Sequence, residues 1–436
     1  MAENVFVIGV VESDPSHSYS MRYFEAIRNA HRYRFHPLLS ANQVYGASHY
    51  PVAELLEEAE GTLRAFPERI DGLLTHRDFP SSTMAPILRE ALGLPGPSLE
   101  SVLRCEHKYW SRVEQQAVVP EHVPRFALVD PYDVDGAGDI ALDYPFWIKP
   151  VRSYASVLGF LIESDDDLRR ALEQIRDGIG RFAEPFNHLL GFADIPPEIA
   201  EADGYHCVAE EIISSDKQCT LEGYVYDGEP LVYGVVDSVR AEGGSSFVRY
   251  QYPSRLPRKV QDRMVAAAHK ILRRTGYDNG PFNMEFFYDE DTDKVWVLET
   301  NARISGAHSP IFQMVEGTPH NEVAVELSLG RRPDYPRGEG EFACAAKFML
   351  RRFEDGVVTA IPSDEEVEQA REEFPELHLE LRVQPGTVLG EMVEQDSYSY
   401  EYAVAYLGGA DEDDLGEKYE RLTQMLTFEF ESPSSK

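Results

Sequence analysis

The sequence has 436 residues, with 76 Asp and Glu against 41 Lys and Arg, which gives a formal net charge of -35 at pH 7. So acidic a chain lacks the basic surface that binding to a phosphate backbone requires, and we therefore expect no nucleic-acid partner. No uncharged apolar run reaches the roughly 18 residues that a membrane helix needs, so no membrane association is expected either.

Two further compositional features bear on where the protein works. The four cysteines (Cys105, Cys207, Cys219 and Cys344) form no CxxC pair, which argues against a zinc site or a disulfide framework. The N-terminus lacks a basic segment followed by an apolar one, so no signal peptide is expected. These features predict a cytoplasmic protein. We interpret the excess of acid as a halophilic adaptation, with an ordinary solvated surface as the alternative.

The first hundred residues alternate between strand-like and helix-like segments. Strands are predicted at 5–11, 33–39 and 70–75, and helices at 19–31, 51–66 and 82–92. This alternation predicts a small parallel sheet with helices on its faces, which we assign to residues 1–105. A second unit at 106–335 mixes strands, hairpins and helices and ends in a Pro-rich segment, and a final α/β piece occupies 336–436.

Several common catalytic signatures are absent. The sequence contains no GxxxxGK[ST] phosphate loop, no GxGxxG after a strand, no HExxH and no GxSxG. Nothing therefore supports a P-loop, a dinucleotide-binding fold, zinc hydrolysis or a serine nucleophile.

The strongest chemical signal is a hairpin predicted over residues 283–303, with an acidic turn at its centre. In this hairpin Glu285 lies opposite Glu299, and Asn301 shares their face because side chains two apart on a strand point the same way. Carboxylate and amide oxygens suit Mg²⁺, which is usually held by a few carboxylates together with phosphate oxygens. A solvated polar face is the alternative, but the flanking residues are apolar, and facing carboxylates repel each other without a cation.

A second signal is a lysine at the end of an apolar strand. Lys149 is followed by Pro150 and by a loop of small residues at 152–159, which includes Ser153 and Ser156. A lysine beside backbone N–H groups is an arrangement that binds phosphate. This signal is weak by itself, because a lysine at a strand end is more often a surface residue.

The third signal is the run at 208–213, in which Glu210 and Glu211 precede apolar residues up to Ile213. An extended hinge strand of this kind offers backbone groups to an adenine and a carboxylate to its amino group. An edge strand with exposed acids explains the pattern about equally well.

Taken in order, these motifs resemble those of the ATP-grasp superfamily, and specifically of its carboxylate–amine ligases. The matching segments are Lys108 before a helix, Lys149-Pro150, Val208 to Ile213, Glu285, and Glu299-x-Asn301-x-Arg303. The resemblance covers roughly residues 1–335, and the C-terminal part is similar to the appended domain of amino-acid-ligase-like members. It implies an α/β, ATP-grasp architecture, with a small N-terminal parallel domain, a two-part core, a lid subdomain at about 140–213 and a C-terminal α/β extension.

The resemblance also implies ligand-binding roles. The residues implied for ATP are Lys108, Lys149, Ser153, Ser156, Glu210, Glu211 and Ile213. The two lysines would meet the phosphates, Glu210 the adenine amino group, and the other hinge residues the base through their backbone. Glu285, Glu299 and Asn301 would bind Mg²⁺, which Mn²⁺ could replace, and Arg303 would meet the acyl phosphate or the substrate carboxylate.

The implied reaction is the joining of a small carboxylate, such as an amino acid, to an amine through an acyl phosphate, with release of ADP and phosphate. The expected partners are these small molecules, and the sequence is compatible with a homodimer. The alternatives are a carboxylase-type member that activates bicarbonate, an argininosuccinate-like accessory ligase, and a catalytically silent ATP-binding module. Arg240, Arg249, Arg255 and His308 are candidates for the substrate pocket, and a structural role is as well supported for each.

Overall fold

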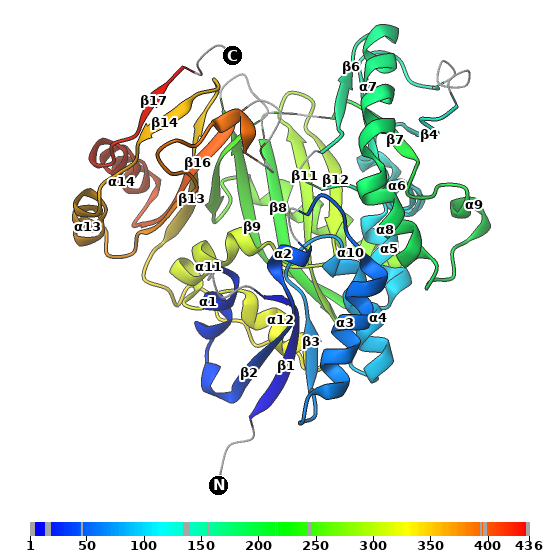
Figure 1. Cartoon of the computed structure of the whole chain (residues 1–436), viewed down its shortest axis with the longest axis horizontal. Helices are drawn as coiled ribbons and strands as arrows, with labels where there is room; N and C mark the ends of the chain where they lie inside the picture. Colours follow the sequence, from blue (N-terminus) through cyan, green and yellow to red (C-terminus); the bar gives the residue numbers. More distant parts are fainter. Residues whose placement is uncertain are drawn as a thin grey trace.

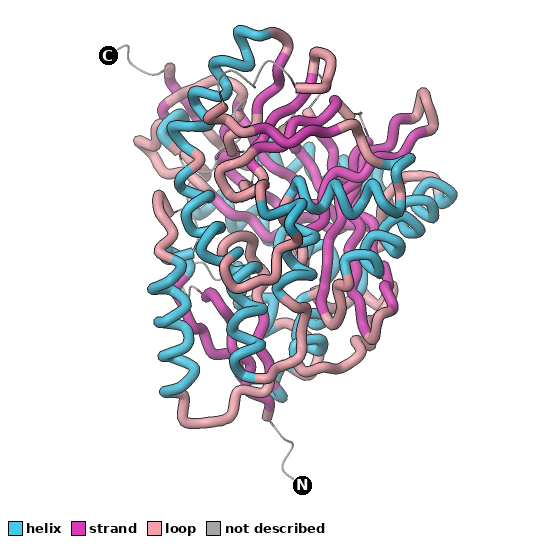
Figure 2. Tube along the Cα trace, turned by 90° about the vertical axis from the view of Figure 1, so that its right-hand side faces the viewer, coloured by secondary structure: helices cyan, strands magenta, loops and turns pink. Residues whose placement is uncertain are grey.

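The computed structural model describes residues 5–13, 19–44, 47–133, 140–154, 157–213, 215, 217–241, 246–392, 395 and 399–432. These residues form sheets of three, four and eight strands and a two-stranded ribbon (Figure 1). The eight-stranded sheet lies in the middle of the molecule, with the three-stranded sheet below it and the four-stranded sheet at the upper right. Figure 2 shows how the helices pack around the strands in the perpendicular view.

The N-terminal sheet is parallel, as the alternation of strands and helices predicts. Its strands follow the order β2-β1-β3, with bounds Phe6–Ser13 for β1, Tyr33–Ser40 for β2 and Gly72–Leu74 for β3. Its helices are α1 (Tyr19–Glu25), η1 (Ala30–Arg32), α2 (Ala41–Val44), α3 (Val52–Ala65) and α4 (Ser81–Leu92). The apolar run of β1 is buried on both faces, as is typical of a strand covered by helices on either side.

The first helix is shorter than the predicted segment at 19–31. It ends at Glu25, and Asn29 has a φ of 56°, a left-handed conformation through which a helix does not continue. The chain therefore turns through η1 into β2. The helices predicted at 51–66 and 82–92 are confirmed to within one residue at each end.

The four-stranded sheet is antiparallel and has the order β4-β7-β5-β6. Its strands are β4 (Phe126–Val129), β5 (Phe146–Pro150), β6 (Phe160–Ile162) and β7 (Cys207–Glu211). The helices before and around it are α5 (Leu99–Glu106), α6 (Lys108–Val118), η2 (Pro120–His122), α7 (Asp165–Gly178), α8 (Gly180–Leu190) and α9 (Pro197–Ala200). Helix α7 begins where the Ser164 side chain accepts a hydrogen bond from the Asp167 N–H, and its apolar stripe packs on the sheet.

The eight-stranded sheet has the order β12-β11-β8-β9-β10-β13-β16-β15 and is antiparallel throughout. Its strands are β8 (Lys217–Tyr226), β9 (Glu229–Arg240), β10 (Phe247–Tyr252), β11 (Gly280–Asp289), β12 (Lys294–Asn301), β13 (Cys344–Arg352), β15 (His378–Leu381) and β16 (Tyr400–Gly409). One face packs on α10 (Arg258–Thr275), and the opposite face on α11 (Ser309–Glu316) and α12 (Asn321–Ser328), which follow η4 (Gly306–His308).

The C-terminal segment extends this same sheet. Helices α13 (Asp364–Glu373) and α14 (Glu412–Met425) pack on β13 and β16, and β14 (Val357–Ala360) pairs with β17 (Glu429–Glu431) beyond η5 (Leu389–Glu391). The domain boundaries near 105 and 335 stay predictions. The strands on either side of residue 335 nevertheless belong to one sheet, so side chains from both segments share its faces.

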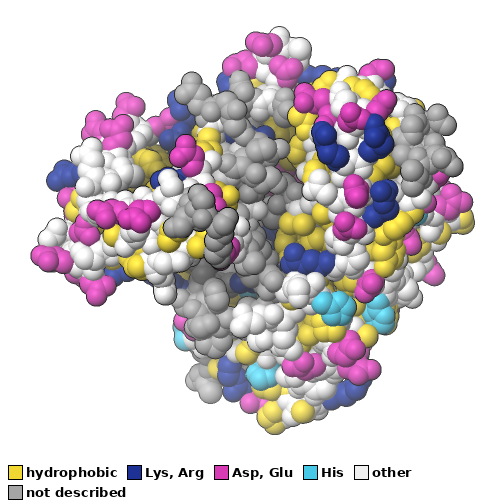
Figure 3. All heavy atoms as spheres, turned by 45° about the horizontal axis from the view of Figure 1, so that its top comes forward, with side chains coloured by type: hydrophobic (Ala, Val, Ile, Leu, Met, Phe, Trp, Pro, Cys, Tyr) yellow, Lys and Arg dark blue, Asp and Glu magenta, His cyan; other side chains and the backbone are white. Residues whose placement is uncertain are grey.

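Two surface properties follow from the described residues. None of their helices combines the length and the apolar composition that crossing a bilayer requires. Figure 3 shows acidic side chains spread over one face of the molecule with basic ones interspersed, in keeping with the excess of Asp and Glu.

Candidate functional site

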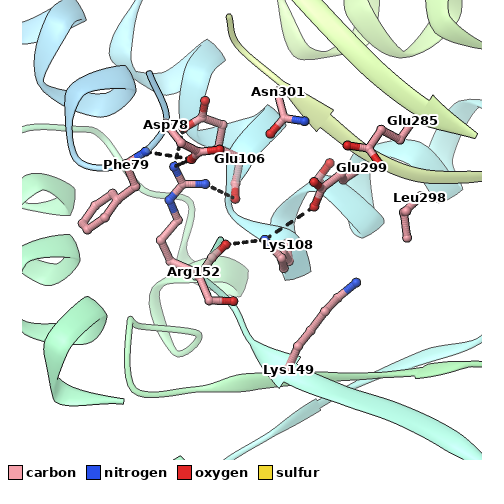
Figure 4. Close-up of polar contacts among 12 residues, drawn as sticks. Asp78, Phe79, Glu106, Lys108, Lys149, Arg152, Glu285, Leu298, Glu299 and Asn301 are labelled. Carbon is pink, nitrogen blue, oxygen red and sulfur yellow. Dashed lines mark hydrogen bonds and ion pairs between the residues drawn. The ribbon is translucent and has the colours of Figure 1, made fainter. Parts of the chain in front are cut away.

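The motifs predicted to bind ATP and metal converge on one pocket. It lies between α6, the four-stranded sheet and the edge strand β12, and it is partly open to solvent. Its lining includes Lys108, Lys149, Glu210, Glu299 and Asn301, with Arg112 and Arg152 between them. Segments far apart in the sequence thus bring five of the predicted residues together (Figure 4).

The two carboxylates of the predicted hairpin do face each other. Glu285 on β11 pairs with Glu299 on β12, and a register shift follows at once, so that Leu298 has no partner of its own. Burial, and then the charge of Glu299, raise the pKa of Glu285 to about 7. The Gln218 side chain donates a hydrogen bond to Glu285 at 2.8 Å. The predicted pairing is confirmed, and at Glu285 burial and the facing carboxylate outweigh the nearby arginines, which lower its pKa.

Lys108 lies beside this acid pair, at the first position of α6. Its Nζ is 3.6 Å from Oε2 of Glu299 and donates a hydrogen bond to the carbonyl oxygen of Ser153 at 2.9 Å. Burial lowers the pKa of Lys108. Burial opposes the charge of Glu299 as well, but Lys108 and Lys149 outweigh it and hold the pKa of Glu299 below its usual range. The ammonium and the carboxylate therefore stabilise each other's charge at the pocket wall.

Lys149 enters the pocket from the opposite side, on β5. Figure 4 shows its side chain pointing from the strand toward the pair formed by Lys108 and Glu299. Its Nζ lies 2.8 Å from Oε2 of Glu210, whose other oxygen accepts a hydrogen bond from Nε of Arg112 at 2.7 Å. Burial opposes ionisation of Glu210, but these two cations outweigh it and lower its pKa to about 2. Glu210 is therefore a doubly paired carboxylate inside the pocket.

The residues present fit a hard divalent cation held by oxygen. The Asn301 amide nitrogen donates to Oδ1 of Asn283 at 2.9 Å, which leaves the carbonyl oxygen as the atom available to a cation. Among the described residues no group of three or more His, Cys, Asp or Glu is arranged around a common point. The candidate set is thus two carboxylates and one amide, a set that leaves room for the phosphate oxygens and water that Mg²⁺ retains.

Arg303 belongs to a second charged cluster next to the pocket. Its Nη2 contacts Oδ2 of Asp78, while Nη2 of Arg152 lies 2.7 Å from the other oxygen of Asp78 and 2.9 Å from Glu106. Burial disfavours the charge on Asp78, but Arg303 and Arg152 outweigh it and hold its pKa far below the usual range. The Nε of Arg303 is buried and makes no hydrogen bond with any described residue. Asp78 thus holds the guanidinium while leaving one of its donors unused.

Comparison with known proteins identifies the domain around this pocket. Residues 142–311, which carry Lys149, the hinge strand and the acid pair, match the family model described as ATP-grasp domain. Residues 142–311 thus form an ATP-grasp domain. Its mixed architecture, with a parallel N-terminal sheet and a large antiparallel sheet, confirms the fold class expected from the sequence.

Solved structures and curated relatives agree with this assignment. The chain resembles the L-amino acid ligase from Bacillus licheniformis with a TM-score of 0.73, at 17% identity over 99% of this chain and 100% of that one. It also resembles the biotin carboxylase from Campylobacter jejuni, with a TM-score of 0.62 at 14% identity over 99% and 93% of the two chains. The C-terminal section of the carbamoyl phosphate synthase large chain from Methanopyrus kandleri is 23% identical over 61% of this chain. The chain spans 45% of that relative's length.

Other predicted residues lie outside the pocket or at its edge. Ser153 is buried and contributes its carbonyl oxygen to Lys108, whereas Ser156 lies outside the described residues. Glu211 pairs with Arg125 at 2.7 Å on the exposed side of β7. Ile213 lies beyond the end of β7, which is shorter than the predicted run, and neither hinge residue lines the pocket. Their contacts with the base stay predictions.

The sequence analysis missed the cations and acids that support the predicted residues. Arg112 is almost fully buried and donates to the carbonyl oxygens of Val297 and Leu298 as well as to Glu210. Its position one helical turn after Lys108 is a signal that could have pointed to it, because residues four apart share a helix face. Asp78 gave no such signal, since only the folded chain brings it to residues of β12 and of the loop after β5.

Proposed function

We propose that this chain is an ATP-dependent carboxylate–amine ligase, which activates a small acid as an acyl phosphate and forms an amide with release of ADP and phosphate. The observation that carries the proposal is the pairing of Glu285 with Glu299 beside the ammonium of Lys108. Facing carboxylates, of which Glu285 has a raised pKa, call for a divalent cation. The adjacent lysines call for an anion, and a metal-bound nucleoside triphosphate supplies both.

Different pocket residues would bind different parts of the metal–nucleotide complex. Glu285, Glu299 and the Asn301 carbonyl oxygen would hold Mg²⁺, which when bound offsets charge on the phosphates. Lys108 and Lys149 would bind phosphate oxygens from opposite walls. Phosphoryl transfer requires little covalent chemistry from the protein, because catalysis comes mainly from positioning and charge neutralisation.

The adenine contact predicted for Glu210 fits this arrangement on one condition. Lys149, which now pairs with Glu210 at 2.8 Å, would have to turn toward the phosphates. Arg112 would stay bonded to Glu210 and keep it ionised. The freed carboxylate oxygen would then be an acceptor for an amino group of the base.

Arg303 is the residue we assign to the acyl group. Its side chain is partly buried, its Nη2 is held by Asp78, and its buried Nε lacks an acceptor among the described residues. A carboxylate would satisfy that donor, since guanidinium and carboxylate pair through two parallel hydrogen bonds. A carboxylate oxygen would attack the terminal phosphorus and displace ADP. The amine nitrogen would then attack the acyl carbon, phosphate would leave, and the nitrogen would lose a proton.

A carboxylase-type reaction is the second candidate, favoured by the likeness to the biotin carboxylase structure and the carbamoyl phosphate synthase relative. In that case bicarbonate would take the place of the acid. The two candidates separate in one assay. Phosphate release that requires added bicarbonate and ignores organic acids would support the carboxylase, and the opposite dependence would support the ligase.

The experiment for the ligase is a phosphate-release screen across pairs of amino acids and small acids, followed by Glu299→Ala. This variant should lose turnover and keep its fold, because it removes a metal ligand at the pocket wall. Glu290→Ala, in the exposed turn of the same hairpin, is the matched control and should turn over normally. Hydroxylamine added with ATP and the active acid should trap a hydroxamate. Normal turnover by folded Glu299→Ala, or release of AMP and pyrophosphate, would contradict the proposal.

A further inference from the structure

One buried lysine outside the ATP pocket has no partner for its charge. Lys347 on β13 is 8% exposed, and its ammonium makes no hydrogen bond or ion pair with any described residue. The ammonium lies 5.6 Å from the centre of the Tyr250 ring. An ammonium with so little access to water and no anionic partner is costly, so a buried lysine of this kind needs an explanation.

The nearest carboxylates do not provide that partner. Glu401 and Glu380 act on Lys347 only from a distance, and both are engaged by arginine. Glu401 lies 3.2 Å from Arg351, and Glu380 lies 3.2 Å from Arg382. Burial accordingly lowers the pKa of Lys347. Both of these carboxylates are therefore already paired with arginine, and neither forms an ion pair with Lys347.

The register of the large sheet places Lys347 on the same face as the predicted metal ligand Glu285. Directly paired residues share a face, and Gln218, Ser238, Tyr250 and Lys347 form one row across four neighbouring strands. Gln218 in turn donates its hydrogen bond to Glu285. This is the face covered by α11 and α12, whereas α10, α13 and α14 pack on the other face.

His308 connects the two ends of this face. Its ring meets the Tyr250 ring edge to face at 5.2 Å. Burial holds the pKa of His308 well below its usual range, and the charges of His320, Lys347 and Arg303 lower it further. The polar face thus continues from Arg303, assigned to the acyl group, past His308 to the ammonium of Lys347.

Lys347 is too far from the metal ligands to hold the reacting carboxylate. Four strand spacings of about 4.8 Å separate β11 from β13. The ATP phosphates are also excluded as the partner of Lys347. Lys108 and Lys149, which would bind them, lie beyond β12, at the opposite edge of the sheet. An anion at Lys347 is therefore a separate group from both.

We propose that Lys347 binds a second anionic group of the substrates, a carboxylate distinct from the one activated beside Glu285. This inference rests on the proposed ligase function and extends it to a substrate class. The carboxylate would belong either to the amine, which would then be an amino acid, or to the distal end of a dicarboxylic acid donor. The C-terminal segment would in this way take part in substrate choice.

The first test measures the anion site without turnover. Wild-type protein is treated with an N-hydroxysuccinimide ester, and acylation of Lys347 and of exposed Lys270 is followed by peptide mapping, in sodium acetate and in sodium chloride of equal ionic strength. Acetate well above its dissociation constant should slow acylation of Lys347 at least about tenfold, because protection grows with the ratio of acetate concentration to that constant, and should leave Lys270 unchanged. Equal rates in both salts, or a Lys347 that is never acylated, would overturn the proposal.

The second test identifies the source of the carboxylate with Lys347→Met, which keeps the volume and removes the charge. Each active amino acid is compared with its amide, and each active dicarboxylic acid with the matching monocarboxylic acid. In wild type and in Lys270→Met, a substrate that lacks the group bound by Lys347 should have a KM at least about tenfold higher, with kcat retained. In Lys347→Met the KM should differ little between the two substrates. If Lys347→Met shows the same KM difference between the paired substrates as wild type, the assignment is wrong.

Thermal unfolding separates a binding role from a structural one. Lys347→Met removes a buried, unpaired charge, so its melting temperature should equal or exceed that of wild type. A lower melting temperature would mark Lys347 as a structural residue and contradict the proposal. The two proposals also fail separately. If no acid and amine pair releases phosphate while acetate still protects Lys347, the ligase function is wrong and the anion site stands.

Discussion

The charge of Glu285 can be tested through its effect on stability. Burial, and then the facing Glu299, raise its pKa from 4.5 to about 7. A group whose pKa is raised by folding binds its proton more tightly in the folded protein than in the unfolded chain. Its stabilising contribution is therefore fully present below about pH 4.5 and is lost as the pH rises through 7. Without metal, the acid pair should destabilise the fold at alkaline pH.

The size of the effect follows from the same numbers. A pKa raised from 4.5 to about 7 corresponds to at most about 3 kcal/mol, at about 1.4 kcal/mol for each pH unit. Because the side chain is only partly buried and Glu299 responds to its charge, we expect roughly 1–2 kcal/mol after screening. Glu285→Gln keeps the shape of the side chain and cannot ionise. Its advantage over wild type in unfolding free energy should therefore grow by that amount between pH 5 and pH 8.

Urea unfolding of both proteins at the two pH values measures this difference. Mg²⁺ added at pH 8 should stabilise wild type more than Glu285→Gln, because a bound cation favours the ionised acid pair. Glu290→Gln, in the exposed turn of the hairpin, is the control and should show no such pH dependence relative to wild type. If the advantage of Glu285→Gln is the same at pH 5 and pH 8, the electrostatic reasoning is wrong.

Three other expectations follow from the pocket and the composition. Lys149→Ala should weaken ATP binding at least tenfold in calorimetric titration, the equivalent of a charge-assisted contact of about 1.5–3 kcal/mol, and unchanged affinity would contradict its role. Arg303→Lys keeps the charge but not the planar fork, so it should bind ATP normally yet lose turnover by orders of magnitude; near-normal turnover would indicate that Arg303 only supports the fold. If the net charge of -35 reflects a halophilic habitat, the melting temperature should rise steeply from dilute buffer to molar salt, and a flat dependence would exclude that interpretation.

The elements that the sequence predicted best are those governed by local rules. The hairpin that pairs Glu285 with Glu299 followed from a turn flanked by two apolar strands, because strand alternation and turn position together fix which residues face each other. The helices at 51–66 and 82–92 followed from composition and flanking prolines. Where one residue overrides the pattern, prediction fails, as at Asn29, whose left-handed conformation ends the first helix early.

The supporting cluster could not be predicted in this way. Asp78, Arg152 and Arg303 are separated by many residues, and they meet only because the small N-terminal sheet, the loop after β5 and the end of β12 pack together. No spacing rule connects such positions. The C-terminal strands gave a similar difficulty, since nothing local in 344–409 shows that they continue the sheet of the ATP-grasp core. The polar face that carries Lys347 becomes visible only once that continuity is known.

The ion pairs of the pocket suggest how it accepts a highly charged ligand at small cost. Each lysine now pairs with a glutamate, so a lysine that moves to phosphate would leave a carboxylate without that partner. Arg112 removes that penalty for Glu210, because it donates to the second oxygen and stays in place when Lys149 turns away. Glu299 has no second cation within ion-pair distance among the described residues, and the bound metal would take over from Lys108. Release of Lys149 from Glu210 is thus independent of metal, whereas release of Lys108 from Glu299 depends on it. Nucleotide and metal should therefore bind most tightly when both are present.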